Sequence, residues 1–514
     1  MAAGGIEAVS LVLAIPGLID LAFKYGEWIV DRIETFQTAK GVWAELKQFG
    51  VGLTKGELRN TILTAKSFYL EEGCDPGLKN SLELQIRRLA VNVETVRIFL
   101  ETQNPDHLFD RIIFTISGER RAKALIKDLK LDVRELTQTL TIGDLYARRV
   151  PNAVLLTHKR FSDYQSFPQK PLSFSTNLLI AKGDYCDDAL QESYREATVI
   201  LERFPAKEEV SEDLIKDIAT YLHNRLPSKV SDGKQDVLLK GILPCLGYRM
   251  TPHVEFVFEM PQNLHNPQTL QTLIVADQGV LRHPLDFRLR LARRLAEAVL
   301  RVHAAGLVHK NIRTETVVVL QPVQPPQDEA TRNAVGFGEV YLTNWRLLRD
   351  AMGPSILSGG THWTEDIYRH PKRQGLQIED KYNMGHDIYS LGVCLLEIGL
   401  WDPLVHMQTA DGQPRVSNLF REAAKVDLSP NPEDELKIKL KKPTEVKEIL
   451  LQLAHDYLPS RMGLGYHRLT VSCLTGLDKP SGFGDGVDFT KMNQAEQGVA
   501  FKELVLSFIT EIAI

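Results

Sequence analysis

The sequence predicts a multidomain protein with an all-α bundle in its N-terminal part and an α+β region in its C-terminal part. The first 150 residues carry apolar side chains at helical spacing and no alternating strand pattern. Residues 151–173 contain prolines among serines, which indicates an extended linker. Beyond it, short β-branched runs alternate with long amphipathic segments. A chain of 514 residues with 43% hydrophobic residues can form two or three folded domains.

Composition excludes several classes of protein. A net charge of −5 and a pI near 6.3 argue against nucleic-acid binding, which requires a basic surface. The five cysteines are far apart and form no C-x-x-C pair, which favours buried intracellular thiols over a disulfide or zinc framework, so no metal site is expected. The chain has no basic segment before its first apolar run, and no uninterrupted apolar run reaches about 18 residues. We therefore expect a cytoplasmic protein.

The first apolar run, residues 5–23, contains Glu7, Pro16 and Asp20, and its uncharged core over residues 8–19 is too short to span a bilayer as one helix. One interpretation is the central helix of a bundle. The other is a membrane-active helix that becomes exposed on activation. The apolar side chains that would serve membrane contact or oligomerisation are Leu11, Leu13, Ile15, Leu18 and Ile19.

Three longer periodic segments complete the predicted bundle over residues 1–150. The first runs from Ile29 to the glycines at positions 50 and 52, and the others cover residues 82–100 and 122–140. Basic side chains gather on the last of these helices, over residues 120–130. Such a face is usually only solvated, and the alternative is contact with anionic lipid.

Residues 5–8, 31–36 and 43–49 give this part its family likeness. It resembles the fungal HeLo domain, the helical prion-inhibition and propagation domain at the N-termini of cell-death effectors. The resemblance implies that the first helix enters membranes after oligomerisation. Physically, this requires several short helices that satisfy one another's polar groups.

In the C-terminal part, residues 306–320 follow an amphipathic helix and lead into a β-branched run. The spacing of His309, Asn311 and Thr316 resembles the protein-kinase catalytic loop H-R-D-x-x-x-x-N. In a kinase the Asp accepts the substrate proton and the Asn holds a metal ion. The amide of Asn311 cannot act as a base, and the hydroxyl of Thr316 is a poor substitute for a metal-binding amide oxygen.

Two further positions belong to this resemblance. Asn344 stands where the kinase D-F-G motif has its metal-binding Asp, and an amide is a much weaker magnesium ligand than a carboxylate. Residues 387–399 resemble the central helix of the large lobe. The resemblance implies that Asp387 supports the catalytic-loop backbone by hydrogen bonding, a structural role that survives loss of activity.

The predicted small lobe is reduced. Residues 178–182 resemble the V-A-I-K strand, which makes Lys182 a weak candidate for binding nucleotide phosphates. No G-x-G-x-x-G motif precedes it. Amphipathic segments 194–204 and 212–224 are both candidates for the helix that pairs with Lys182, and the second fits better. The carboxylate partner stays open among Glu196, Glu202 and Asp217.

The kinase-like resemblance covers residues 174–514, and it implies a bilobal fold with a small lobe at about 174–262 and a large lobe at about 263–514. We expect no cofactor, with ATP binding possible but doubtful. The first functional hypothesis is a pseudokinase that restrains a membrane-directed or oligomerising effector of programmed cell death or heterokaryon incompatibility. Its partners would be further copies of the chain, an upstream sensor protein and an anionic membrane surface. The alternatives are an active atypical Ser/Thr protein kinase that binds ATP, and a soluble protein-interaction scaffold.

Overall fold

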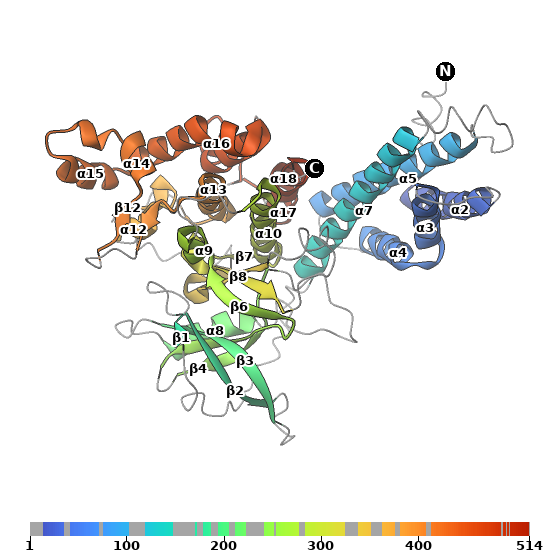
Figure 1. Ribbon diagram of the computed structural model, residues 1–514. Helices are drawn as coiled ribbons and strands as arrows, with labels where there is room; N and C mark the ends of the chain where they lie inside the picture. Colours follow the sequence, from blue (N-terminus) through green and yellow to red (C-terminus); the bar gives the residue numbers. More distant parts are fainter. Residues whose placement is uncertain are drawn as a thin grey trace. The chain divides into compact units, whose positions relative to one another are not determined.

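The computed structural model divides the chain into two compact units, Met1–Asp144 and Leu145–Ile514 (Figure 1). The sequence places this boundary near residue 150. The structure describes residues 14–34, 42–70, 76–101, 119–147, 170–171, 178–186, 194–204, 211–222, 241–250, 253–276, 283–323, 338–350, 362–375, 381–407, 413–484, 487–489, 491–492 and 494–512.

The first unit is helical, as the sequence predicts. Its helices are α2 (Ile15–Glu34), α3 (Val42–Lys55), α4 (Glu57–Leu70), α5 (Pro76–Glu101) and α7 (Glu119–Ala147). The apolar stripes predicted for residues 82–100 and 122–140 form much of one shared core with α2 and α3. Helical periodicity thus translates directly into burial here.

One predicted helix is wrong. The sequence suggests a single helix from Ile29 to the glycines at 50 and 52, whereas α2 ends at Glu34 and α3 continues through both glycines to Lys55. The glycines do not end the helix, because Gly50 allows close packing. A Cβ on Gly50 would lie 2.9 Å from Val30 Cγ2 and 3.0 Å from the carbonyl oxygen of Gly26. The backbone of α3 at Gly50 therefore packs directly against α2, with no room for a methyl group between the two helices.

Part of the first apolar run lies in this core. Ile15, Leu18 and Ile19 are each 1% exposed, on the face of α2 that packs into the bundle. Leu11 and Leu13 fall outside the described residues. In the part of the chain that the structure describes, no helix is both long enough and apolar enough to cross a membrane.

The second unit is α+β and begins with an antiparallel five-stranded sheet. Its strand order is β1-β2-β3-β5-β4. The strands are β1 (Lys170–Pro171), β2 (Leu178–Cys186), β3 (Tyr194–Arg203), β4 (Cys245–Arg249) and β5 (Glu255–Glu259). Helix α8 (Glu212–Thr220) follows β3, and the Ser211 hydroxyl caps its N-terminus. Strand β1 lies within the predicted linker.

The interpretation of residues 194–204 as a helix is wrong. They form β3, which pairs with β2 on one side and β5 on the other. Val199, Ile200 and Leu201 are fully buried because the strand is central and covered on both faces. A buried central strand carries a continuous apolar run instead of alternation, so its period does not identify it.

The rest of the unit surrounds the candidate site. A second sheet has the order β6-β8-β9, and β7 pairs with β10. These elements are β6 (Leu264–Thr269), α9 (Leu270–Ala276), α10 (Leu285–Ala304), β7 (Leu307–Val308), η5 (Thr314–Thr316), β8 (Val317–Pro322), β9 (Glu339–Leu342), η6 (Trp345–Leu347), β10 (Arg349–Asp350), α12 (Trp363–Asp366) and η7 (Pro371–Arg373).

The remaining elements form a helical layer at the end of the unit opposite the five-stranded sheet (Figure 1). Helix α13 is buried along its whole length and packs against α10 and α16. The elements are α13 (Met384–Leu400), β11 (Val405–His406), β12 (Arg415–Val416), α14 (Asn418–Ala423), η8 (Val426–Leu428), α15 (Pro432–Leu440), α16 (Pro443–Thr475), α17 (Gln494–Phe501), η9 (Lys502–Ser507) and α18 (Phe508–Ile512).

Candidate functional site

The candidate site is the segment between β7 and β8, which contains the predicted catalytic-loop positions. Asp387 on α13 lies beneath it, fully buried. Its carboxylate accepts hydrogen bonds from the backbone N–H groups of His309 (2.8 Å) and Lys310 (2.9 Å) and from the Tyr382 hydroxyl (2.6 Å). His303 Nε2 lies 3.1 Å from the same carboxylate. These contacts fix a turn in which Lys310 has a left-handed φ of 66°.

The charge of Asp387 is retained despite its burial. Burial alone raises the pKa of a carboxyl, but the contacts with His303, His309 and Tyr382 hold the pKa of Asp387 below its ordinary value. The structure thus places this side chain against the backbone of the segment, in the position that the sequence resemblance implies.

His309 is buried in the same segment. Its Nδ1 lies 3.3 Å from the backbone nitrogen of Asn311, and its ring meets the edge of Trp345 with centroids 4.6 Å apart. Burial lowers the pKa of His309 to about 4, so the imidazole is neutral near pH 7. The ring packs within the fold and is not exposed to a substrate.

Thr316 closes the segment on itself. Its Oγ1 lies 2.7 Å from the carbonyl oxygen of Asn311 and 3.0 Å from that of Arg313, and it accepts the backbone N–H of Arg313 at 3.0 Å. A hydroxyl has one donor and two acceptor positions, and these contacts occupy most of them. The Thr316 oxygen is therefore committed to the loop.

Asn311 is the residue that the sequence analysis aligns with the kinase base. The residue is 4% exposed, and its Nδ2 has no hydrogen-bond partner among the residues that the structure describes. An amide has no basic lone pair that titrates near neutral pH. The segment consequently offers a neutral group where proton transfer would need a carboxylate.

Asn344 is held by Glu202, which the sequence offers only as a candidate partner of Lys182. It adopts a left-handed conformation (φ 67°, ψ 58°) at the start of η6, and its backbone N–H donates to Glu202 Oε2 at 2.8 Å. Glu202 stands near the end of β3 and is 3% exposed. Burial raises the pKa of Glu202 to about 8, against the lowering effects of the η6 backbone N–H groups and of Arg346.

The strand order places Lys182 away from α8, and its predicted contact with nucleotide phosphates stays a prediction. Lys182 lies in β2, opposite Thr198 of β3, so β3 separates it from α8. In kinases the phosphate-binding Lys is on the strand that leads to the helix carrying its Glu partner. In this chain the strand that leads to α8 is β3, and Glu202 near its end contacts the backbone at the start of η6. Of the proposed partners, Glu196 and Glu202 are therefore on a strand, and only Asp217 is on α8.

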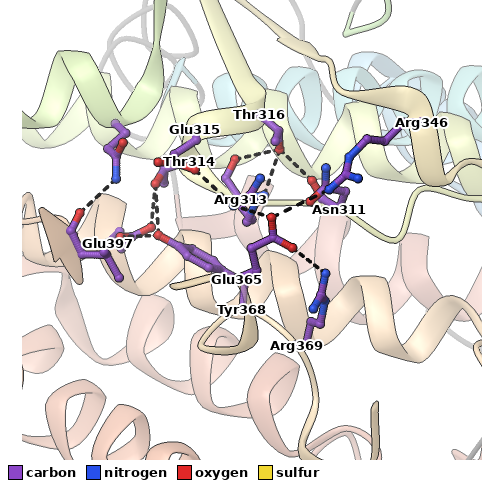
Figure 2. A network of polar contacts seen from close by, with 12 residues as sticks. Asn311, Arg313, Thr314, Glu315, Thr316, Arg346, Glu365, Tyr368, Arg369 and Glu397 are labelled. Atoms are coloured by element: carbon purple, nitrogen blue, oxygen red, sulfur yellow. Dashed lines mark hydrogen bonds and ion pairs between the residues drawn. The ribbon is translucent and has the colours of Figure 1, made fainter. Parts of the chain in front are cut away.

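A second acidic residue, Glu365 on α12, joins three parts of the site (Figure 2). Its carboxylate lies 3.7 Å from Arg313 of the loop, 3.7 Å from Arg346 of η6 and 2.7 Å from Arg369. Burial raises the pKa of a carboxyl, but these arginines hold the pKa of Glu365 below its ordinary value. The ion pairs bind the loop, η6 and α12 together, and no sequence pattern predicts this pairing.

Glu397 of α13 supports η5 from within. It is fully buried and accepts hydrogen bonds from the Thr314 hydroxyl (2.9 Å), the Tyr368 hydroxyl (2.8 Å) and the backbone N–H of Leu404 (2.7 Å). Burial raises the pKa of Glu397 to about 7. Because its partners are internal groups, Glu397 positions the segment and does not face a ligand.

Positions 311, 316 and 344, which the sequence analysis aligns with the kinase base and metal ligands, therefore carry side chains with neutral oxygens. Within the described ranges, no group of three or more His, Cys, Asp and Glu side chains could hold a metal ion. The chain matches no known protein-family model, and no curated protein is significantly similar to it.

Proposed function

We propose that the chain is a catalytically impaired, kinase-fold signalling protein, a pseudokinase, with a HeLo-like N-terminal effector. The hydrogen bond between Glu202 and Asn344 carries this proposal. Phosphoryl transfer needs positive charge around the triphosphate, from a Lys and from metal ions held by carboxylates. A buried carboxyl at the end of β3, kept mostly protonated near pH 7 by its raised pKa, and an amide at position 344 supply no positive charge and no metal-binding carboxylate.

The order of elements supports the kinase-like assignment. A long helix (α10), the loop between β7 and β8, the strand β9, the turn at Asn344 and the α13 Asp387 follow one another as the corresponding kinase motifs do. Asp387 accepts a hydrogen bond from the loop backbone at His309. The Thr316 hydroxyl binds the Asn311 carbonyl oxygen, and Glu397 accepts a hydrogen bond from the Thr314 hydroxyl. These internal hydrogen bonds support a kinase-like fold that is stable without the groups that transfer phosphate.

The N-terminal unit acts as the effector in this proposal. Ile15, Leu18 and Ile19 are buried at rest, and their exposure would let copies of the chain assemble and bind an anionic membrane. The kinase-like unit restrains this step in the cytoplasm until an upstream sensor protein acts on it. The outcome is programmed cell death or heterokaryon incompatibility.

The test is a thermal-shift titration of the full chain with millimolar ATP and Mg²⁺. We expect no measurable stabilisation in the wild type. The matched series is the double variant Asn311→Asp/Asn344→Asp, with and without Glu202→Lys, and we expect nucleotide binding only when a positive charge is introduced at position 202. Stabilisation of the wild type by several degrees, lost in Lys182→Ala, would favour the atypical active kinase instead.

A further inference from the structure

Two histidines of α16 lie side by side on the exposed side of the helical layer. His467 Nε2 is 2.9 Å from His455 Nδ1, and the two ring centroids are 4.9 Å apart. His455 is exposed and His467 is partly buried. Because the nitrogens face each other at hydrogen-bond distance, one ring donates and the other accepts in the neutral pair.

The pair spans a bend in the helix. Gly463 has φ 83° and ψ 163°, which interrupts the helical path, and Pro459 lies one turn before it. His455 belongs to the first half of α16 and His467 to the second. On the inner side of the bend, the Tyr466 hydroxyl donates to the carbonyl oxygen of Leu395 at 2.8 Å, which anchors the second half to α13.

The neighbouring carboxylate of Asp456 is engaged by the side-chain amide of Gln452, at 2.8 and 2.7 Å. Neutral imidazole nitrogens are the form that binds transition metals.

We propose that His455 and His467 form a two-imidazole site for a divalent transition metal, of the Zn²⁺, Ni²⁺ or Cu²⁺ class, that clips the two halves of α16 together across the bend. Zn–N bonds of about 2.0–2.1 Å at a tetrahedral angle place the two nitrogens about 3.4 Å apart. To admit the ion, the nitrogens need to separate by about half an ångström and the rings need to turn so that both lone pairs point at it. Water completes the coordination, which makes this an open site on the surface, independent of the proposed function.

The experiment is a calorimetric titration of the full chain with Ni²⁺ at pH 7.5. We expect one binding event that weakens at least tenfold in His455→Ala and in His467→Ala, and that is unchanged in the control His253→Ala, a solvent-exposed histidine of the same unit. Circular dichroism confirms that each variant is folded.

A second readout is the electron paramagnetic resonance spectrum of Cu²⁺ bound to the wild type, which should carry hyperfine splitting from two imidazole nitrogens. Unchanged Ni²⁺ affinity in both single variants would overturn the proposal. Wild-type Ni²⁺ binding no tighter than that of His455→Ala/His467→Ala would also overturn it, and so would a Cu²⁺ spectrum without nitrogen ligands.

Discussion

The backbone N–H of Asn344 donates a hydrogen bond to the carboxyl of Glu202 across 2.8 Å, which joins η6 to the end of β3. A residue from the five-stranded sheet thereby caps the turn that begins at Asn344. The bond fixes the left-handed backbone at position 344 and places an acid beside it, and it links the geometry of the small sheet to that of the loop region.

Glu202→Gln should raise stability at alkaline pH. Because the pKa of Glu202 rises from 4.5 to about 8 in the folded protein, the folded state binds the extra proton. The free energy of unfolding therefore falls as pH rises from about 4.5 to about 8, by an upper bound of about 4–5 kcal/mol at 1.36 kcal/mol per pKa unit. Glutamine still accepts the Asn344 N–H but does not ionise, so this part of the fall disappears. Urea denaturation at pH 6 and pH 8.5 measures it.

The control for that experiment is Asp217→Asn, an exposed carboxylate on α8. It should leave the pH dependence as in the wild type. Some slope near pH 7 remains in Glu202→Gln, because the pKa of Glu397 is raised to about 7. Identical pH profiles for Glu202→Gln and the wild type would contradict the assignment of a buried, protonated Glu202.

Asp387→Ala should destabilise the second unit by about 3–5 kcal/mol, because it leaves the backbone N–H groups of His309 and Lys310 and the Tyr382 hydroxyl without their acceptor. Asp387→Asn keeps one acceptor oxygen and should lose less. Chemical denaturation followed by tryptophan fluorescence measures both. The exposed Asp434→Asn is the matched control, and a loss below about 1 kcal/mol in Asp387→Ala would argue against the bracing role.

The wild-type chain should transfer no measurable phosphate to itself or to generic substrates with Mg²⁺ and ATP. Carboxylates are missing at positions 311 and 344 together, and groups that act as a unit lose most of the rate when any is removed. A radiolabel assay compares the wild type with Asp387→Ala, which reports contaminating kinases. Turnover of the wild type clearly above that background would overturn this expectation.

Residues 1–150, separated from the rest of the chain, should release dye from anionic liposomes, and the intact chain far less. Leakage should rise steeply with protein concentration, because one copy is too short to span, and it should fall with salt as anionic lipid is screened. Leu18→Glu should abolish leakage and cost about 3–5 kcal/mol of stability, since Leu18 is 1% exposed.

Leu84→Glu is the matched control for that prediction, because Leu84 is 62% exposed on α5 and should tolerate the change. The comparison is made on anionic and neutral vesicles with each variant. Equal inactivity of residues 1–150 on both lipids would move the interpretation to the scaffold alternative.

Sequence periodicity was sufficient to predict helices in the first unit. An apolar stripe at helical spacing can be recognised within one segment, and the side chains of that stripe are the ones that become buried. Periodicity failed for β3 and for Gly50. The neighbours of β3 come from β2 and from β5, which lies about fifty residues further along the chain, so pairing outside the segment decides its conformation. Gly50 has a packing role that depends on the opposing surface of α2.

For the candidate site, motif spacing identified Asp387 and the degenerate positions, since these lie in one linear order. Glu365 was not assigned to it, and Glu202 was considered only as a partner of Lys182. Each reaches the site from a distant segment, and nothing in the linear sequence links Glu202 to Asn344 or Glu365 to Arg313. Such pairs follow only from the fold.

In the proposed pseudokinase, the hydroxyl of Thr316 makes recovery of kinase activity by a single substitution difficult. It ties the carbonyl oxygens of Asn311 and Arg313 to one short turn. A return to Asn at this position would supply a metal ligand but remove the link that keeps the loop closed, and without a carboxylate at position 344 the ligand would have no metal to share. Each single reversion therefore lowers stability or leaves activity unchanged. In the proposed pseudokinase, internal hydrogen bonds of the fold therefore stabilise the inactive loop, and recovery of catalysis requires several substitutions at once.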